Sequence, residues 1–217
     1  MTVCQESVLR LARFLDKKPT IETAGGHRFS DLASLKFLCY NSEKDKGERK
    51  VFREMRRKRQ QMTESACMEI IEKNTSGVLG VLGDGGYPYA VPLSYVYDGG
   101  CLYFHCAKSG HKLDAIRNCD KVSFCIVDQD LVVPEEYTTY FRSVILFGKA
   151  RILENEAEVR GAIEKLAVKY HPEDAKEHRD MMIEREYNAM CMVKIEIEHM
   201  TGKEAVELVA RGRVSLR

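Results

Sequence analysis

The side chains in this sequence that could do chemistry gather in one short stretch, Tyr103–Lys112, which reads YFHCAKSGHK. The stretch holds two histidines, a cysteine, a serine and two lysines, directly after an apolar run. Such side chains could bind a metal, pair a nucleophile with its base, hold an anion, or belong to an ordinary capped helix. Their spacing and the surrounding elements distinguish these alternatives.

A metal site and a nucleophilic site both need side chains that converge. His105, Cys106 and His111 are of types that bind zinc, but neighbouring residues of a strand point to opposite faces, so His105 and Cys106 diverge. The sequence has no second cluster of ligand-type residues, and no carboxylate is placed to orient a histidine beside Cys106. We therefore predict no metal site and an inert, packed Cys106.

An anion site at the end of the stretch fits the residue types better. Ser109 and Gly110 precede a predicted helix, KLDAIRN, whose first backbone amides and dipole favour negative charge. Lys112 adds a full charge, Ser109 or His111 can donate hydrogen bonds, and Gly110 lets the backbone approach a ligand. From this feature alone, a phosphate cradle and an ordinary capped helix with an exposed lysine both stay open.

The elements that must position this stretch are mostly β-strands. A capped helix, TESACMEIIEKN, precedes three strand-like runs, GVLGVLG, YAVPLSYVY and CLYFHCA, which are separated by the turns DGGYP and DGG. Pro92, in the second run, has no amide hydrogen to give to a sheet. This predicts an edge or bulged strand that leaves backbone groups for a ligand.

The second half of the chain predicts further strands and one inserted helical segment. A strand VSFCIVD is followed by a loop containing VVPEEYTTY, and then by the long run FRSVILFGKARILE with a bend at Gly148. Helical spacing covers residues 156–170 and extends into a charged stretch to about residue 186, before a last strand, MCMVKIEIEHMTGK. The order predicts a mainly β (α+β) protein, a six-stranded antiparallel barrel with flanking helices.

Composition excludes several classes of protein. The 217 residues are 44% hydrophobic and 31% charged, with a net charge of +1, so nothing draws the whole chain to nucleic acid or to anionic membranes. The basic cluster at residues 53–59 lacks interleaved aromatic residues and predicts a solvated helix start or linker. Eight cysteines without a CxxC pair favour reduced thiols, and no apolar run approaches the roughly 18 residues of a membrane span. We expect a cytoplasmic protein.

A long part of the chain resembles a known family. The runs GDGGYPYAVPLSYVYDGGCLYFHCAKSGHKLDAIRNCDKVSFCIVD and FRSVILFGKARIL resemble the pyridoxamine 5'-phosphate oxidase-like FMN-binding split barrels, in particular the branch with the 5-nitroimidazole resistance proteins. The resemblance covers roughly residues 55–203. It implies an FMN-binding split-barrel domain at 55–217, preceded by an extension of unknown role at 1–54. The C-terminal substrate motif of true pyridoxamine phosphate oxidases is not seen, which argues against vitamin B6 oxidation.

The resemblance implies a homodimer that holds FMN between its subunits and acts on a small-molecule substrate. It places Ser109, His111 and Lys112 at the phosphate, residues 91–95 beside the isoalloxazine, and Arg142 with Ser143 near the flavin. The implied cofactor-binding residues are Val91, Pro92, Leu93, Ser94, Tyr95, His105, Ala107, Ser109, Gly110, His111, Lys112, Arg142 and Ser143. His111 replaces the arginine of the oxidases proper, and a partly charged histidine implies a pH-dependent affinity for the phosphate.

His105 is the implied catalytic residue, because the nitroimidazole-resistance relatives carry a histidine near the flavin at this position. A core histidine bonded to a backbone carbonyl is the open alternative. The implied function is an FMN-dependent oxidoreductase of nitroreductase type, whose small substrates include nitroaromatics. Two other functions stay open: a non-catalytic flavin-binding or storage module, and a haem-binding split barrel with His105 or His199 as axial ligand.

Overall fold

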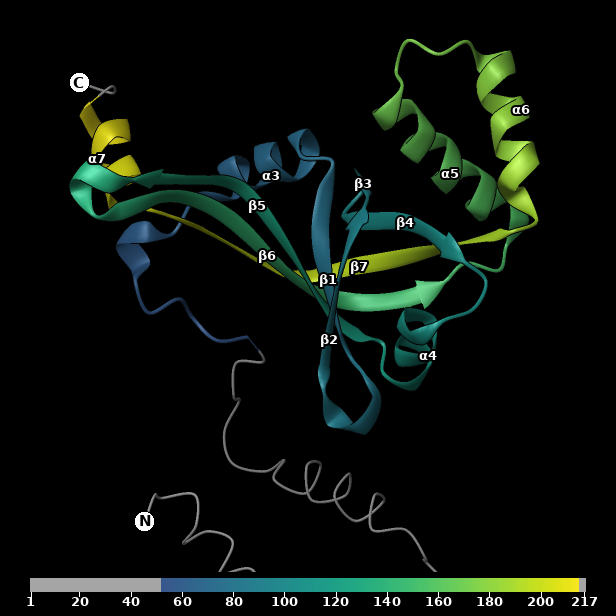
Figure 1. Cartoon of the computed structure of the whole chain (residues 1–217), viewed down its shortest axis with the longest axis horizontal. Helices are drawn as coiled ribbons and strands as arrows, with labels where there is room; N and C mark the ends of the chain where they lie inside the picture. Colours follow the sequence, from purple (N-terminus) through teal and green to yellow (C-terminus); the bar gives the residue numbers. More distant parts are fainter. Residues whose placement is uncertain (1–51, 215–217) are drawn as a thin grey trace, which may run out of the picture. The chain divides into compact units, whose positions relative to one another are not determined.

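The computed structural model describes residues 52–214, with side chains described as far as residue 210, so most of the predicted extension lies outside the described residues. Short 3-10 helices are labelled η. The elements are η1 (Lys58–Gln60), α3 (Glu64–Lys73), β1 (Ser76–Leu82), η2 (Asp84–Gly86), β2 (Pro88–Ser94), β3 (Val96–Asp98), β4 (Cys101–Ala107), α4 (His111–Asn118), β5 (Lys121–Val133), η3 (Pro134–Glu136), β6 (Thr138–Ile152), α5 (Glu156–Tyr170), α6 (Lys176–Tyr187), β7 (Met190–Glu204) and α7 (Val206–Val214) (Figure 1).

The strands form one seven-stranded sheet in the order β2-β1-β5-β6-β7-β4-β3, and all its neighbours pair antiparallel (Figure 1). Although β2 and β3 are nearly continuous in the chain, they stand at the two edges of this order. The sheet therefore curls until its edges approach each other at residue 95, but it does not close. The predicted class, a mainly β barrel with flanking helices, is confirmed.

The predicted strand count is wrong by one, because the run YAVPLSYVY divides at Tyr95. The Tyr95 side chain is fully buried, and its hydroxyl donates a hydrogen bond to the carbonyl of Ile71 at 2.7 Å. Its ring meets Phe124 edge-on, with 5.1 Å between the ring centroids. A buried tyrosine needs such a partner for its hydroxyl. The hydrogen bond to α3 places Tyr95 outside the strand pairing, so β2 ends at Ser94 and β3 begins at Val96.

Strand β2 pairs only with β1, where Pro92 lies opposite Val78. The predicted edge position of Pro92 is confirmed. Exposed residues alternate along β2 with the half-buried Tyr89, Val91 and Leu93, which pack against the core. The other face of β2 is left for contacts outside the sheet.

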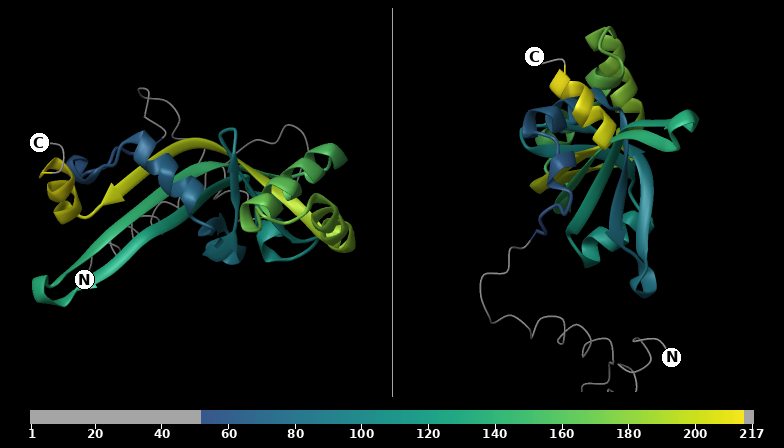
Figure 2. Two further views of the ribbon diagram at one scale, coloured as in Figure 1. Left: turned by 90° about the horizontal axis from the view of Figure 1, so that it is seen from above. Right: turned by 90° about the vertical axis from the view of Figure 1, so that its left-hand side faces the viewer.

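Strands β5 and β6 are longer than the sequence predicts. The predicted loop around VVPEEYTTY is wrong: pairing continues through Leu131–Tyr140 to Val133–Thr138, and only η3 and Tyr137 form the turn. The β-branched valines and threonines favour strand on both sides of the proline. The resulting arm, defined here as residues 129–142, projects beyond the rest of the sheet (Figure 2).

The bend predicted at Gly148 is confirmed as an irregularity in one long strand, because the β6–β7 register shifts between Phe147 and Gly148. A Cβ atom at this position would lie 2.1 Å from the carbonyl oxygen of Glu196. The backbones of β6 and β7 therefore approach so closely at this position that only glycine fits.

Replacing Gly148 with alanine is expected to lower the free energy of unfolding by about 3 kcal/mol, because a backbone carbonyl cannot yield as a flexible side chain can. Urea denaturation measures this change. Gly161→Ala is the matched control: it lies in α5 with nothing within 4 Å of the added atom, and should stabilise by about 0.5–1 kcal/mol. Equal stability of G148A and the wild type would contradict the close approach.

The helices cover different parts of the sheet. Helix α3 begins after Thr63, whose hydroxyl accepts the Ala66 amide at 3.3 Å, and buries Ile70 and Ile71 in the main core. Helices α5 and α6 form a hairpin over the region where β4 pairs with β7 (Figure 1), so α6 is a separate helix and not an extension of α5. None of the helices in residues 52–214 is long and apolar enough to cross a membrane.

Candidate functional site

The stretch at Tyr103–Lys112 is the end of β4, a short connection, and the start of α4. Phe104 and Cys106 are buried, whereas His105 and Ala107 are exposed on the other face, as strand alternation predicts. Within the described part of the chain, no group of three or more histidine, cysteine or acidic side chains could hold a metal ion. The end of β4 therefore has one face exposed to solvent, with His105 and Ala107, and one face buried in the core, with Phe104 and Cys106.

The anion cradle predicted from the sequence would lie at the start of α4, whose first backbone amides are open. Gly110 precedes the helix with φ 131°, a conformation that favours glycine, and nothing lies within 4 Å of its Cβ position. The amides of Leu113 and Asp114 both donate to the Gly110 carbonyl, at 2.9 and 3.2 Å. The amides of His111 and Lys112 have no backbone partner among the described residues. Together with Ser109 and Lys112, they fit a phosphate group.

His111 is turned toward the β1–β2 hairpin. Its ring stacks on Tyr89, with 4.2 Å between the centroids, and its Nε2 accepts the backbone amide of Asp84 at 3.3 Å. The Asp84 carboxylate lies 3.7 Å from the same nitrogen. Because Nε2 can accept the amide only when it carries no proton, protonation would exchange this hydrogen bond for the ion pair. His111 is thus already engaged on one side, unlike Ser109 and Lys112.

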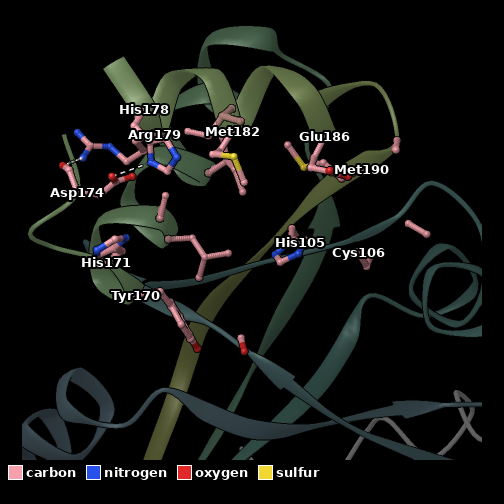
Figure 3. A pocket seen from close by; sticks show the side chains of 17 residues that line it. His105, Cys106, Tyr170, His171, Asp174, His178, Arg179, Met182, Glu186 and Met190 are labelled. Atoms are coloured by element: carbon pink, nitrogen blue, oxygen red, sulfur yellow. Dashed lines mark hydrogen bonds and ion pairs between the residues drawn. The ribbon is translucent and has the colours of Figure 1, made fainter. Parts of the chain in front are cut away.

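A cavity of about 680 Å³ lies between β4 and the α5–α6 hairpin (Figure 3). Three of the predicted site residues, Ser94, His105 and Ala107, line it. The other lining residues are Cys106, Ile163, Leu166, Ala167, Tyr170, His171, Asp174, His178, Arg179, Met182, Ile183, Glu186, Ala189 and Met190. The size is typical of a site for a small organic molecule.

His105 lies on the β4 side of this cavity, and Met182 lies across from it on α6 (Figure 3). Its imidazole makes no hydrogen bond or ion pair within residues 52–214, so the core-histidine alternative is wrong. The walls around it are largely apolar. A proton-carrying group in such a place can contact a bound molecule directly.

Asp174, His178 and Arg179 lie together where α5 turns into α6, whereas Glu186 lies at the other end of α6, near Met190 (Figure 3). The Asp174 carboxylate lies 2.8 Å from Nδ1 of His178, and the Asp174 carbonyl accepts a hydrogen bond from Arg179 at 3.0 Å. Arg179 also lies 3.7 Å from Glu164. These pairs fix the turn, and they leave the middle of the cavity apolar.

The sequence did not predict the α5–α6 wall. Helical spacing of Ile163, Leu166 and Tyr170 indicates an amphipathic helix but not its partner. The charged stretch to about residue 186 indicated helix but no packing face, because α6 buries none of its residues fully.

The remaining predicted site residues separate into two groups. Pro92 is exposed on β2, where half-buried Val91 and Leu93 pack on the core, while Tyr95 is wholly a core residue. Arg142 and Ser143 lie elsewhere: Arg142 pairs with Glu204 at one end of β7, whereas His105 pairs with Met192 at the other end. One chain therefore does not bring Arg142 and His105 together.

Arg142 lines a second cavity, of about 370 Å³, beside α3. Its Nε lies 3.1 Å from Glu204, and next to it Asp128 accepts Lys73 at 2.6 Å and the Asn74 amide at 3.0 Å. Burial alone would raise the pKa of Asp128, but the hydrogen bonds from Lys73 and Asn74 and the charges of Lys73 and Arg142 outweigh it and lower that pKa. The cluster is therefore a stable set of ion pairs at neutral pH.

A carboxyl group whose pKa is lowered by folding stabilises the folded state above its unfolded pKa, and this contribution is lost as the pH falls through the folded value. The stability of the wild type should therefore fall more steeply than that of Asp128→Asn between about pH 5 and pH 3. Urea denaturation at several pH values measures the two slopes. Asp114→Asn, in an exposed pair with Arg117, is the control and should follow the wild type. Parallel curves for D128N and the wild type would contradict the assignment.

Comparisons with known proteins agree with this fold. A protein of Bacteroides thetaiotaomicron VPI-5482, described as a candidate 5-nitroimidazole antibiotic resistance protein, is 20% identical, with a TM-score of 0.56 over 66% of this chain and 86% of that one. A conserved hypothetical protein of Mycobacterium tuberculosis is 20% identical, with a TM-score of 0.57 over 66% and 85%. An FAD- and haem-binding protein of Mycobacterium smegmatis is 18% identical, with a TM-score of 0.56 over 67% and 73%.

Among curated proteins, none matches the sequence. The family model for pyridoxamine 5'-phosphate oxidase matches residues 63–204, which run from the N-cap of α3 to the last residue of β7. This confirms the resemblance seen in the sequence, and the matched range contains both the open start of α4 and the cavity at His105. The chain belongs to the pyridoxamine 5'-phosphate oxidase family.

Proposed function

We propose that this protein is a flavin-dependent oxidoreductase that binds FMN and acts on a small, flat substrate. One observation carries the proposal: the open amides at the start of α4 lie directly after the strand end whose His105 and Ala107 line a large apolar cavity. FMN has a phosphate at one end, which would bind the open amides of α4, and a flat ring at the other end, which would lie toward the cavity at His105. The family and its flavin-binding neighbours support the same assignment.

The phosphate end would be held by the amides of His111 and Lys112, the Ser109 hydroxyl and the Lys112 ammonium group. Lys112 is half-buried, so its charge acts in a less screened environment than that of a fully exposed lysine. His111 contributes less than the sequence implied, because Asp84 and Tyr89 already hold its ring. The isoalloxazine would lie against the exposed face of β2 at Pro92 and Ser94.

A homodimer would complete this site. Several large apolar side chains are exposed on the β5–β6 arm and the adjoining strand positions, namely Val127, Leu131, Val132, Tyr137, Ile145 and Phe147. A row of this kind is typical of a surface that another protein covers. Arg142 and Ser143 lie on the same hairpin. If a second copy packed along this hairpin, Arg142 and Ser143 of one subunit would lie near the anion cradle of the other, which they cannot reach within their own chain.

FMN, when bound, supplies the transfer of one or two electrons. The chain's own part would be to exclude water and to place the substrate beside His105, whose imidazole can give a proton to an oxygen or nitrogen of the substrate. The apolar walls formed by Met182, Ile163 and Leu166 favour an uncharged aromatic body. Nitroaromatic compounds fit this description, in keeping with the description of the Bacteroides relative.

The absorption spectrum of the purified protein, before and after addition of FMN, tests the proposal. Flavin bands that stay with the protein through gel filtration, together with faster oxidation of the reduced flavin when a nitroaromatic compound is added anaerobically, would support it. Bound flavin without any acceleration by a panel of nitro compounds and quinones would favour a storage module. A colourless protein that takes up no added FMN would refute both.

Haem binding is the second candidate, because His105 faces an apolar cavity of sufficient size and carries no partner within the described residues. The other predicted axial ligand, His199, stacks on Phe52 with 4.6 Å between the ring centroids and does not line this cavity. Titration with haem decides: a Soret band that His105→Leu abolishes and His199→Leu preserves would favour this function over the flavin enzyme.

A further inference from the structure

Two cysteines stand directly opposite each other at the start of β7. Cys106 on β4 and Cys191 on β7 are partners in the antiparallel register, and their sulfur atoms lie 3.7 Å apart. Both are free thiols in the structure. Among the other described cysteines, none has a hydrogen-bond contact between sulfur atoms like this one.

The backbone geometry of this pair already fits a disulfide. Opposite residues of an antiparallel pair have Cα atoms about 4.5–5.5 Å apart, which lies inside the range of about 4.4–6.8 Å found for disulfides. Closing the sulfur atoms from 3.7 Å to a bond of about 2.05 Å needs only a side-chain rotation.

We propose that Cys106 and Cys191 are a redox modification site, which a small-molecule disulfide such as oxidised glutathione converts to an intramolecular disulfide. The sulfur of Cys191 attacks the small disulfide, forming a mixed disulfide and releasing one small thiol. The sulfur of Cys106 then attacks the Cys191 sulfur and releases the second. Two protein thiols are oxidised by two electrons, the small disulfide is reduced to two thiols, and the two protons of the protein thiols pass to them.

The order of the two attacks follows from exposure. Cys191 is partly exposed, whereas Cys106 is buried. Burial is also the largest cause of a raised pKa for Cys106, and the neighbouring Cys191 raises that pKa further. Once Cys191 carries the mixed disulfide it can no longer be an anion, so the second cause disappears, while the charge of Lys112 continues to favour the Cys106 thiolate.

The position of the pair gives its oxidation a consequence. Cys106 lines the 680 Å³ cavity and lies just before the connection to the anion cradle, and Cys191 follows Met190, another lining residue, at the point where the α5–α6 hairpin returns to the sheet. A disulfide would link β4, which precedes the anion cradle, to β7, which follows the α5–α6 hairpin. This site goes beyond the proposed oxidoreductase function, since neither step of its formation uses a flavin.

The test treats the reduced full-length protein with oxidised glutathione, blocks remaining thiols with N-ethylmaleimide, and maps peptides under non-reducing conditions. We expect a linked peptide pair that contains Cys106 and Cys191, the loss of both thiols, and full reversal by dithiothreitol. We also expect a rise in unfolding temperature of roughly 5 °C or more, because the link closes a long loop. Recovery of Cys106 and Cys191 as separate maleimide adducts, while other cysteines are oxidised, would overturn the proposal.

Variants separate the roles of the two thiols. Cys106→Ser should stop at a mixed glutathione disulfide on Cys191, and Cys191→Ser should leave Cys106 unmodified. Cys119→Ser is the matched control: this cysteine is also partly exposed, and its loss should leave the Cys106–Cys191 link unchanged. If Cys106→Ser does not fold, the wild-type map and Cys191→Ser still decide, and modification of Cys106 in Cys191→Ser would overturn the proposed order of attack.

Discussion

Replacing Lys112 with methionine is expected to weaken FMN binding by about 10- to 150-fold. The substitution keeps the apolar stem but removes the ammonium group that we propose to bind the phosphate. Hydrogen bonds to charged groups contribute about 1.5–3 kcal/mol, which corresponds to this range of affinity. Quenching of flavin fluorescence on titration measures the dissociation constant directly, without any assumption about substrate or electron donor.

Two controls separate a phosphate contact from a structural role. Lys121→Met changes another lysine, exposed at the start of β5, and should leave FMN affinity unchanged. Riboflavin lacks the phosphate, so K112M and the wild type should bind it equally. An equal loss for FMN and riboflavin would mean that Lys112 supports the fold around the cavity and does not bind the phosphate. An unchanged affinity for FMN would remove the cradle from the site altogether.

The local sequence was sufficient for those parts of the fold that depend on neighbouring residues. Thr63 before α3 and the glycine turns are signals of this kind, and each indicated the right element. Tyr95 was misassigned because its conformation depends on a carbonyl of α3, which no local pattern reveals. The arm was misassigned because Pro134 and two glutamates look like a loop, although η3 and Tyr137 are enough to turn a hairpin there.

The candidate site divides in the same way. Gly110 and Lys112 are recognisable from sequence because a glycine and a cation at a helix start are local features. The cavity is not recognisable, because His105 acquires its surroundings from α5 and α6, which follow it in the chain only after β5 and β6. For Arg142, the resemblance to the family implied a place near the flavin. The sheet register shows that, within one chain, Arg142 lies at the opposite end of β7 from the strand that leads to the cradle.

His105→Leu is expected to leave FMN bound and to slow the oxidation of the reduced flavin by a nitroaromatic compound about 100-fold or more. A positioned proton donor typically contributes a factor of about 10²–10⁴ to a rate, and leucine cannot give a proton. His105→Gln keeps a hydrogen-bond donor but not an acid, so it should recover substrate affinity more than rate. Anaerobic stopped-flow absorbance follows the flavin in each variant.

His171→Leu is the matched control for this experiment. It makes the same change in the same cavity, but at the α5–α6 turn, away from the strand that leads to the cradle (Figure 3). If His171→Leu slows the reaction and His105→Leu does not, the proton donor is on the helical wall and the role given to His105 is wrong. If both variants retain the wild-type rate, the cavity binds its substrate without acid catalysis. Because fluorescence titration reports flavin binding separately, a slow variant that has simply lost FMN is recognised before its rate is interpreted.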